Sequence, residues 1–234
     1  MKKRIISIWL TLSFVLSCFM VMPMTASADS QMKPQDVAIE AGLLKNIGIL
    51  SGIPDAVDGN KEMSRADFVV LVGSIFGFES GVASKRYFED VPMDHWAAVQ
   101  INGLTEMGIL SLPGADKLYR PTDKITEAEA MKILISVLGY GDYAKMSGGY
   151  PNGYAQVASL LDFTYTGSNN NLTQYKAIIM MYDALNSCMY EKSAAGGGYI
   201  NYEESDETLL SKYFDIYAAE GMVTQSEGVS VYGD

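Results

Sequence analysis

The side chains best suited to binding chemistry stand at the beginnings of three similar helical segments. Arg65 follows Ser64 at the start of the first segment, which sets a guanidinium at the positive end of a helix. Free backbone N–H groups, the helix dipole and a guanidinium together suit a carboxylate ligand. The equivalent positions hold Glu127 and Gln174. The pattern therefore predicts at most one fully equipped anion site, with Glu127 expected to repel an anion; a solvated surface charge is the alternative interpretation of Arg65.

Two of the three helix starts carry a capping box. Ser64 with Asp67, and Thr126 with Glu129, each combine an N-cap hydroxyl with a carboxylate three residues later. Asp67 and Glu129 are thus most simply cap residues, with ligand contact as the alternative. In the third segment, Leu172–Ala177 takes the place of the capped start.

The stretch 88–140 is the clearest copy of a repeated unit. Its first helix is expected to begin at the N-cap Asp94 and to end at Gly108, and its second to run from Thr126 to Gly139. Apolar residues at helical spacing predict the buried sides, namely Trp96, Val99, Ile101, Leu104 and Met107, then Met131, Leu134, Val137 and Leu138. Repeats of this size bury a core only by packing on one another.

Weaker copies lie on both sides of this unit. Met63–Phe68 matches Ile125–Ala130 at an offset of 62, and the third copy aligns through its second half at an offset of 47. The first helix of the third copy is expected at Tyr154–Phe163. Residues 193–198 are predicted to be a flexible linker because of their glycines. Beyond them the sequence predicts a short helix over Leu209–Ala219, and strand-like segments at 222–224 and 229–232.

Residues 1–28 have the pattern of a secretory signal peptide. Three basic residues precede an apolar run, and Ala26-Ser-Ala28 is a small-x-small cleavage site. A membrane anchor, or a lipoprotein using Cys18, is the alternative. Cys188 then remains as the single cysteine of the mature chain, expected to be a small buried side chain, and it cannot form an internal disulfide.

The mature protein is strongly acidic. Removing residues 1–28 takes away three basic residues and no acidic one, which changes the formal net charge from −11 to −14. This charge argues against nucleic acid binding, which needs a basic face, and no membrane span is expected after signal cleavage. An anionic polymer must instead be held by local cations, which screening beyond about 10 Å makes feasible. The sequence contains no catalytic constellation or cofactor motif, so no enzyme activity, metal or cofactor is predicted.

One set of motifs extends over the whole of the clearest unit: Phe88-Glu-Asp-Val-Pro, Trp96, Gly108-Ile109, Tyr119-Arg-Pro121, Ile125-Thr-Glu-Ala-Glu129 and Leu138-Gly139. It resembles the S-layer homology (SLH) module of bacterial cell-envelope proteins. The resemblance extends more weakly to residues 34–80 and, through a variant with Gly148-Gly-Tyr-Pro-Asn-Gly-Tyr154 seen in clostridial relatives, to a degenerate copy at 141–190. It defines 86–140 as the second of three modules.

The resemblance implies an all-α fold in which three modules form a pseudo-threefold helical bundle. Grooves between modules hold secondary cell-wall polysaccharide, a peptidoglycan-linked glycan that often carries pyruvylated sugars. This anchors an exported protein in the cell wall or S-layer of a Gram-positive bacterium, where neighbouring S-layer proteins are further partners. The sequence is then expected to be the N-terminal part of a longer protein, with 199–234 beginning a further region.

The resemblance also suggests polysaccharide-binding residues. Arg65 matches the module's sugar-contacting arginine, and Arg120 partly substitutes for the arginine missing at position 127. Trp96 is a candidate apolar platform for a sugar face, although core packing is the favoured interpretation, and Tyr150 stands near the place of Trp96 in the third copy. Asp67 and Glu129 complete the candidates, whereas the loop residue Asp90 is expected to bond backbone, with ligand contact as the alternative.

Two other functions remain open on the sequence alone. The chain could be the targeting region of an exported glycan-acting enzyme whose catalytic domain follows residue 234. Alternatively, its helical repeats could bind a protein partner.

Overall fold

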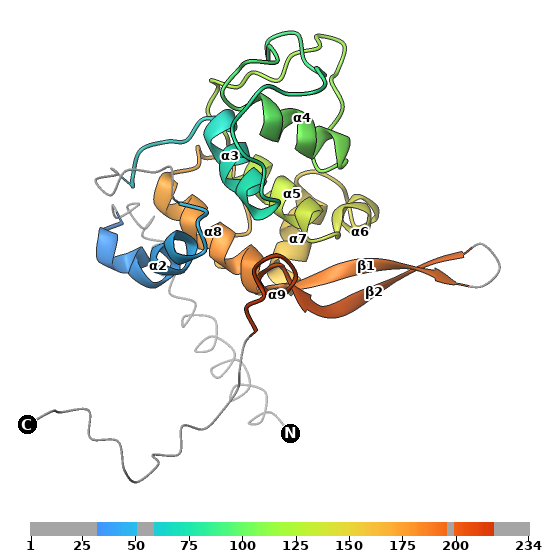
Figure 1. Ribbon diagram of the computed structural model, residues 1–234. Coiled ribbons are helices and arrows are strands. Elements are labelled where there is room, and N and C mark those ends of the chain that lie inside the picture. Colours follow the sequence, from blue (N-terminus) through green and yellow to red (C-terminus); the bar gives the residue numbers. More distant parts are fainter. Residues whose placement is uncertain (1–31, 51–58, 196–198, 218–234) are drawn as a thin grey trace, which may run out of the picture. The chain divides into compact units, whose positions relative to one another are not determined.

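A computed structural model describes residues 32–50, 59–195 and 199–217. Its elements in chain order are η1 Pro34–Val37, α2 Ala38–Asn46, α3 Arg65–Ile75, α4 Ala98–Glu106, α5 Glu127–Val137, α6 Gly141–Met146, α7 Asn152–Leu160, α8 Gln174–Asn186, β1 Cys188–Ala195, β2 Tyr199–Thr208 and α9 Leu209–Phe214. Figure 1 labels all of them except η1. The protein is mainly α-helical. The signal peptide, and the strand-like segments at 222–224 and 229–232, lie outside the described residues.

The three predicted helix starts are capped by side chains. The Ser64 side chain accepts from the Asp67 N–H, and the Thr126 side chain accepts from the Glu129 N–H. The Asp67 and Glu129 carboxylates in turn accept from the backbone N–H of Ser64 and Thr126. Thr173 accepts from the Lys176 N–H without a reciprocal bond, because an ammonium has no acceptor. The capping boxes predicted before α3 and α5 are therefore confirmed, and α8 has half of one.

A closed ring of backbone hydrogen bonds joins the segments before these helices. Met63 donates to the Leu172 carbonyl (2.9 Å), Leu172 to Ile125 (2.8 Å), and Ile125 back to Met63 (3.2 Å). All three residues are buried. The backbone N–H of the first residue of each helix donates to a carbonyl in the segment before another of the three helices. The donor–acceptor pairs are Arg65–Asp123, Glu127–Asn170 and Gln174–Lys61. The ring fixes how the three helix starts face one another.

Each of the three capped helices packs on a helix from another part of the chain. α4 packs on α3, α7 on α5, and α2 on α8. The capped helices α3 and α5 thus each pack on a helix later in the chain, whereas the last capped helix, α8, packs on α2 near the beginning. Phe68, Leu134 and Met180, one from each capped helix, are completely buried in a common core.

The first helix of the clearest unit begins later than predicted. Asp94 is not its N-cap: His95 donates to the Pro92 carbonyl (3.0 Å) in a turn, and α4 begins at Ala98 without a side-chain cap. Trp96 therefore precedes the helix and is 53% exposed, which contradicts its interpretation as a core residue. Met107, at the C-cap of α4, is also exposed, whereas Ile101 and Leu104 are completely buried.

The predicted buried side of α5 is confirmed. Met131, Leu134, Val137 and Leu138 are all buried. Gly108 and Gly139 follow α4 and α5 with φ of 75° and 90°, as predicted for helix-ending glycines. In the third repeat the first helix is α7, which begins two residues before the predicted Tyr154 and leaves Phe163 in the following loop. The sequence pattern did not predict α6.

A β-hairpin occupies the region for which a linker is predicted. β1 and β2 pair antiparallel, with Ser193 opposite Asn201, so residues 193–195 are strand rather than linker. Residues 196–198 lie outside the described part. The base of the hairpin is fixed to α5, because Tyr190 donates to the Leu138 carbonyl (2.8 Å) and its ring stacks on Tyr140 at 4.6 Å. α9 confirms the predicted short helix over part of its range. Cys188 is half-buried and free.

Candidate functional site: the Arg65 cavity

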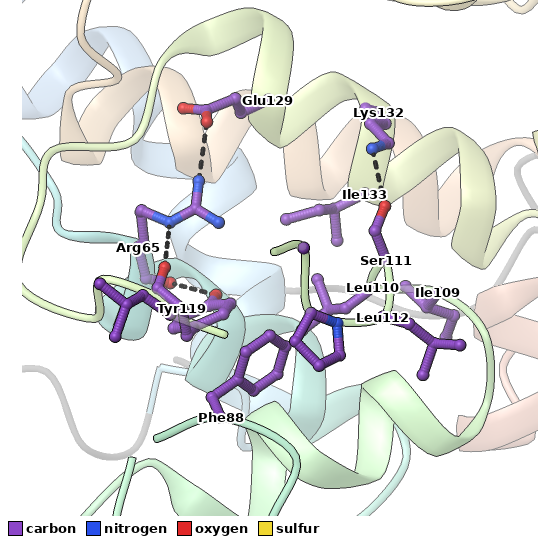
Figure 2. Close-up of a pocket in the computed structure, with 13 residues that line it drawn as sticks. Arg65, Phe88, Ile109, Leu110, Ser111, Leu112, Tyr119, Glu129, Lys132 and Ile133 are labelled. Atoms are coloured by element: carbon purple, nitrogen blue, oxygen red, sulfur yellow. Dashed lines mark hydrogen bonds and ion pairs between the residues drawn. The ribbon is translucent and has the colours of Figure 1, made fainter. Parts of the chain in front are cut away.

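Arg65 is the first residue of α3, and its side chain reaches the neighbouring repeat. Its Nη1 donates to Glu129 Oε1 at 2.7 Å, and its Nε donates to the Tyr119 carbonyl at 3.0 Å (Figure 2). The guanidinium also lies 4.8 Å from the centre of the Tyr119 ring. The side chain is 24% exposed. Within the described residues Nη2 has no hydrogen-bond partner, so this nitrogen can donate to a ligand.

The loop that carries Tyr119 is held by Asp90. Its two carboxylate oxygens accept from the backbone N–H groups of Tyr119 (2.8 Å) and Arg120 (2.7 Å). This confirms the prediction that Asp90 bonds backbone. The Tyr119 ring is buried against Phe88, and burial raises the pKa of its hydroxyl well above the usual value. Tyr119 is therefore a neutral, rigid wall beside the guanidinium.

A cavity of about 220 Å³ opens beside Arg65. Its apolar wall includes Phe88, Ile109 and Leu110, and its polar groups include Glu129 and Lys132. Figure 2 shows Ile133 between the Arg65 and Lys132 side chains, with Lys132 bonded to Ser111 (3.0 Å). Burial lowers the pKa of Lys132, and the positive charges of Lys145 and Arg65 lower it further, whereas Glu129 raises it. The cavity thus combines an apolar wall with two cations and one carboxylate.

The equivalent position in the second repeat has different chemistry. Glu127 is buried, and its two carboxylate oxygens accept from Lys176 Nζ and Ser168 Oγ, each at 2.8 Å. The expectation that Glu127 would repel an anionic ligand is therefore wrong, because its charge is compensated and turned inward. The third equivalent, Gln174, is half-buried and neutral.

The other predicted site residues lie apart from this cavity. Trp96 contacts His95 with ring centres 5.7 Å apart, and Arg120 pairs with Asp116. Neither lines the cavity. Asp67 is exposed and completes its cap. Tyr150 is 49% exposed, and the Lys132 ammonium lies 5.7 Å from its ring centre. Of the six predicted residues, the structure therefore brings only Arg65 and Glu129 together in the cavity.

Sequence reasoning missed the second cation, Lys132. It follows Glu129 by three residues and precedes Ile133, and residues spaced by three or four share one side of a helix. Extending the helical phase from Glu129 would have placed Lys132 on the same side. Tyr119 belongs to the motif Tyr119-Arg-Pro121, but its contact with Arg65 depends on the loop conformation that Asp90 stabilises.

Two absences apply to the described part of the chain. No group of three or more His, Cys, Asp or Glu side chains there could hold a metal ion. None of its helices is long and apolar enough to cross a membrane.

Comparison with known proteins shows which family part of the chain is similar to. Residues 87–131 match the family model of the S-layer homology domain. This stretch contains α4, the Asp90–Tyr119 loop and the start of α5, including Glu129. Residues 87–131 are therefore similar to an SLH domain, in agreement with the sequence resemblance, and this stretch supplies part of the lining of the Arg65 cavity.

Three curated proteins are similar over most of the chain. A "Surface layer protein" of Brevibacillus choshinensis is 30% identical over 207 residues, which are 84% of this chain and 18% of that protein. A "Middle cell wall protein" of Brevibacillus brevis is 29% identical over 192 residues (79% and 18%). A "Cell surface protein" of Thermoanaerobacter kivui is 25% identical over 169 residues (70% and 21%).

These similarities indicate where the protein works. The chain spans about a fifth of the length of these relatives. The names of the relatives and the SLH match support a secreted location in the cell wall or S-layer, as predicted.

Proposed function

We propose that this chain anchors an exported protein to the cell wall by binding a secondary wall polysaccharide, and that the Arg65 cavity receives an acidic group of that glycan. The observation that carries the proposal is the Arg65 guanidinium, which is partly exposed at the start of α3 and has one nitrogen still able to donate. A pyruvyl ketal is the acidic group that fits this chemistry, because a carboxylate pairs well with a guanidinium.

Local charge supports an anionic ligand despite the acidity of the whole protein. Arg65 and Lys132 both line the cavity, and the N-terminal end of α3 adds its partial positive charge. Exposed acidic groups more than about 10 Å away are largely screened at physiological ionic strength. The apolar wall at Phe88, Ile109 and Leu110 suits the less polar face of a sugar ring.

The structural frame of the proposal is three SLH repeats at 34–80, 86–140 and 141–190 in a pseudo-threefold bundle. The ring of hydrogen bonds through Met63, Ile125 and Leu172 supports it, and so does the rotation of helix partners. The frame gives three interfaces of similar backbone geometry. Only the interface at Arg65 combines a partly exposed guanidinium with a cavity among the described residues.

Sedimentation with purified wall sacculi of the native host tests the proposal. The mature protein is expected to sediment with sacculi that carry their polysaccharide, and to stay in solution after the polysaccharide has been stripped. Sacculi stripped only of pyruvyl groups are expected to retain much less protein. Equal sedimentation with intact and fully stripped sacculi, or none with either, would overturn the proposal; binding to an isolated envelope protein instead would favour a protein partner.

A further inference from the structure

A second cavity adjoins the Arg65 cavity on the far side of Lys132. Its volume is about 420 Å³. Its walls include Tyr87, Tyr154, Glu106 and Lys145. The two cavities share five lining residues, namely Ile109, Leu110, Ser111, Leu112 and Lys132. They are therefore separated only by the short segment after α4 and by one lysine side chain.

Lys132 occupies the boundary between the two cavities. Its Nζ donates to Ser111 Oγ, on the same dividing segment, at 3.0 Å. Arg65 on one side and Lys145 on the other both lower its pKa through their positive charges, in addition to the larger effect of burial. The three cations are thus close enough to interact, and they follow the line of the two cavities.

The volumes argue that one ligand spans both spaces. Small-molecule sites usually measure about 300–1,000 Å³. The Arg65 cavity falls below this range and the second cavity falls within it. The first space is thus suited to one sugar unit with its acidic substituent, while the second offers room, tyrosine rings and polar groups for the next unit.

We propose that the two cavities form one groove for an anionic oligosaccharide of at least two sugar residues, in which Lys132 contacts both residues. The inference rests on the proposed function, and it adds the minimum length of the ligand and the residues that contact it. Arg65 holds the acidic unit, and Lys145 with Tyr87 holds the neighbouring unit. The half-buried Tyr87 ring, with the Lys85 ammonium 4.4 Å from its centre on one face, offers an apolar surface with a polar end, which suits a sugar.

Titration calorimetry with two sizes of ligand tests this groove. The probes are one-repeat and four-repeat fragments of wall polysaccharide from the native host, each titrated into the full mature chain. The unchanged protein is expected to bind the longer fragment at least tenfold more tightly per fragment. Lys145→Met is expected to abolish most of this gain and to leave the affinity for the one-repeat fragment within about twofold. Lys132→Met is expected to weaken both fragments at least tenfold.

Lys117→Met is the matched control, because Lys117 is exposed, pairs with Glu89 and lines neither cavity. It is expected to change neither affinity, and thermal unfolding of each variant verifies that it is folded. Equal affinity of the unchanged protein for both lengths, or a full length effect in Lys145→Met, would overturn the extended groove while leaving the proposed function standing. Failure of the unchanged protein to bind either fragment would overturn both.

Discussion

Two interfaces of the bundle use the same helix positions with opposite charges. At the first interface, Arg65 at the first position of α3 pairs with Glu129 at the third position of α5. At the second interface, Glu127 at the first position of α5 pairs with Lys176 at the third position of α8. The backbone contacts of the two interfaces match. The same scaffold therefore accepts either polarity of ion pair.

Exposure distinguishes the two ion pairs more than geometry does. The Arg65 and Glu129 side chains are 24% and 35% exposed, whereas those of Lys176 and Glu127 are 13% and 5% exposed. A partly exposed pair can exchange one partner for a ligand at small cost. A buried pair cannot, because either charge would be left without compensation in a weakly polar interior. If the proposed function holds, the first interface is the one suited to bind a ligand, and the second is suited to hold the helices together.

Removing one partner of the buried pair should give the largest effect on stability. Lys176→Met leaves Glu127 buried with only the Ser168 hydroxyl, and is expected to lower the free energy of unfolding by about 3–5 kcal/mol. The double variant with Glu127→Gln should recover much of this loss, because no unpaired charge remains. Urea unfolding of the mature chain measures both, with Lys117→Met as the exposed-lysine control. A loss under 1 kcal/mol for Lys176→Met would show that the second interface is no tighter than the first.

The corresponding change at the first interface should cost less stability. Arg65→Met removes a partly exposed ion pair and one hydrogen bond to the Tyr119 carbonyl, so the expected loss is about 1–2 kcal/mol. Glu129 remains usable as a cap residue, since its other oxygen accepts from the Thr126 N–H. The same unfolding measurement checks this value. A loss equal to that of Lys176→Met would contradict the distinction between a binding and a holding interface.

The helix caps should show the smallest difference between the interfaces. Thr126→Ala breaks a reciprocal capping box and is expected to cost about 1 kcal/mol. Thr173→Ala breaks a single bond at 3.4 Å and is expected to cost about 0.5 kcal/mol. Thermal unfolding of the two variants compares them directly. A larger loss for Thr173→Ala would contradict the expectation that a reciprocal capping box stabilises a helix start more than a single cap bond does.

Local signals in the sequence predicted the local structure of the repeats well. Hydroxyl N-caps predicted the beginnings of α3 and α5, and glycines predicted the ends of α4 and α5, because these residues act within a few positions along the chain. The Thr173 cap of α8 was not singled out from the sequence. Asp94 failed as a cap since the turn after Pro92 continues to Ala97, a conformation that one candidate cap residue cannot reveal. The β-hairpin was missed because three glycines dominate the sequence of its connection.

Contacts between repeats were beyond local reasoning. Arg65 was found because its helix position has a charge preference of its own, yet its actual partners, Glu129 and Tyr119, come from the next repeat. Glu127 was misjudged for the same reason, since Lys176 follows it by almost fifty residues. Such pairs depend on how the helices exchange partners, and a single sequence contains no periodicity that reveals it.

The most direct test of the account compares Arg65→Ala with Gln174→Ala in titrations of four-repeat wall polysaccharide fragments. These residues occupy the same helix position in two interfaces, so the comparison holds the scaffold constant. One binding site per chain is expected, with at least a tenfold loss of affinity in Arg65→Ala and a change under twofold in Gln174→Ala. Equal losses in the two variants, or unchanged binding in Arg65→Ala, would contradict the claim that the Arg65 interface carries the attachment.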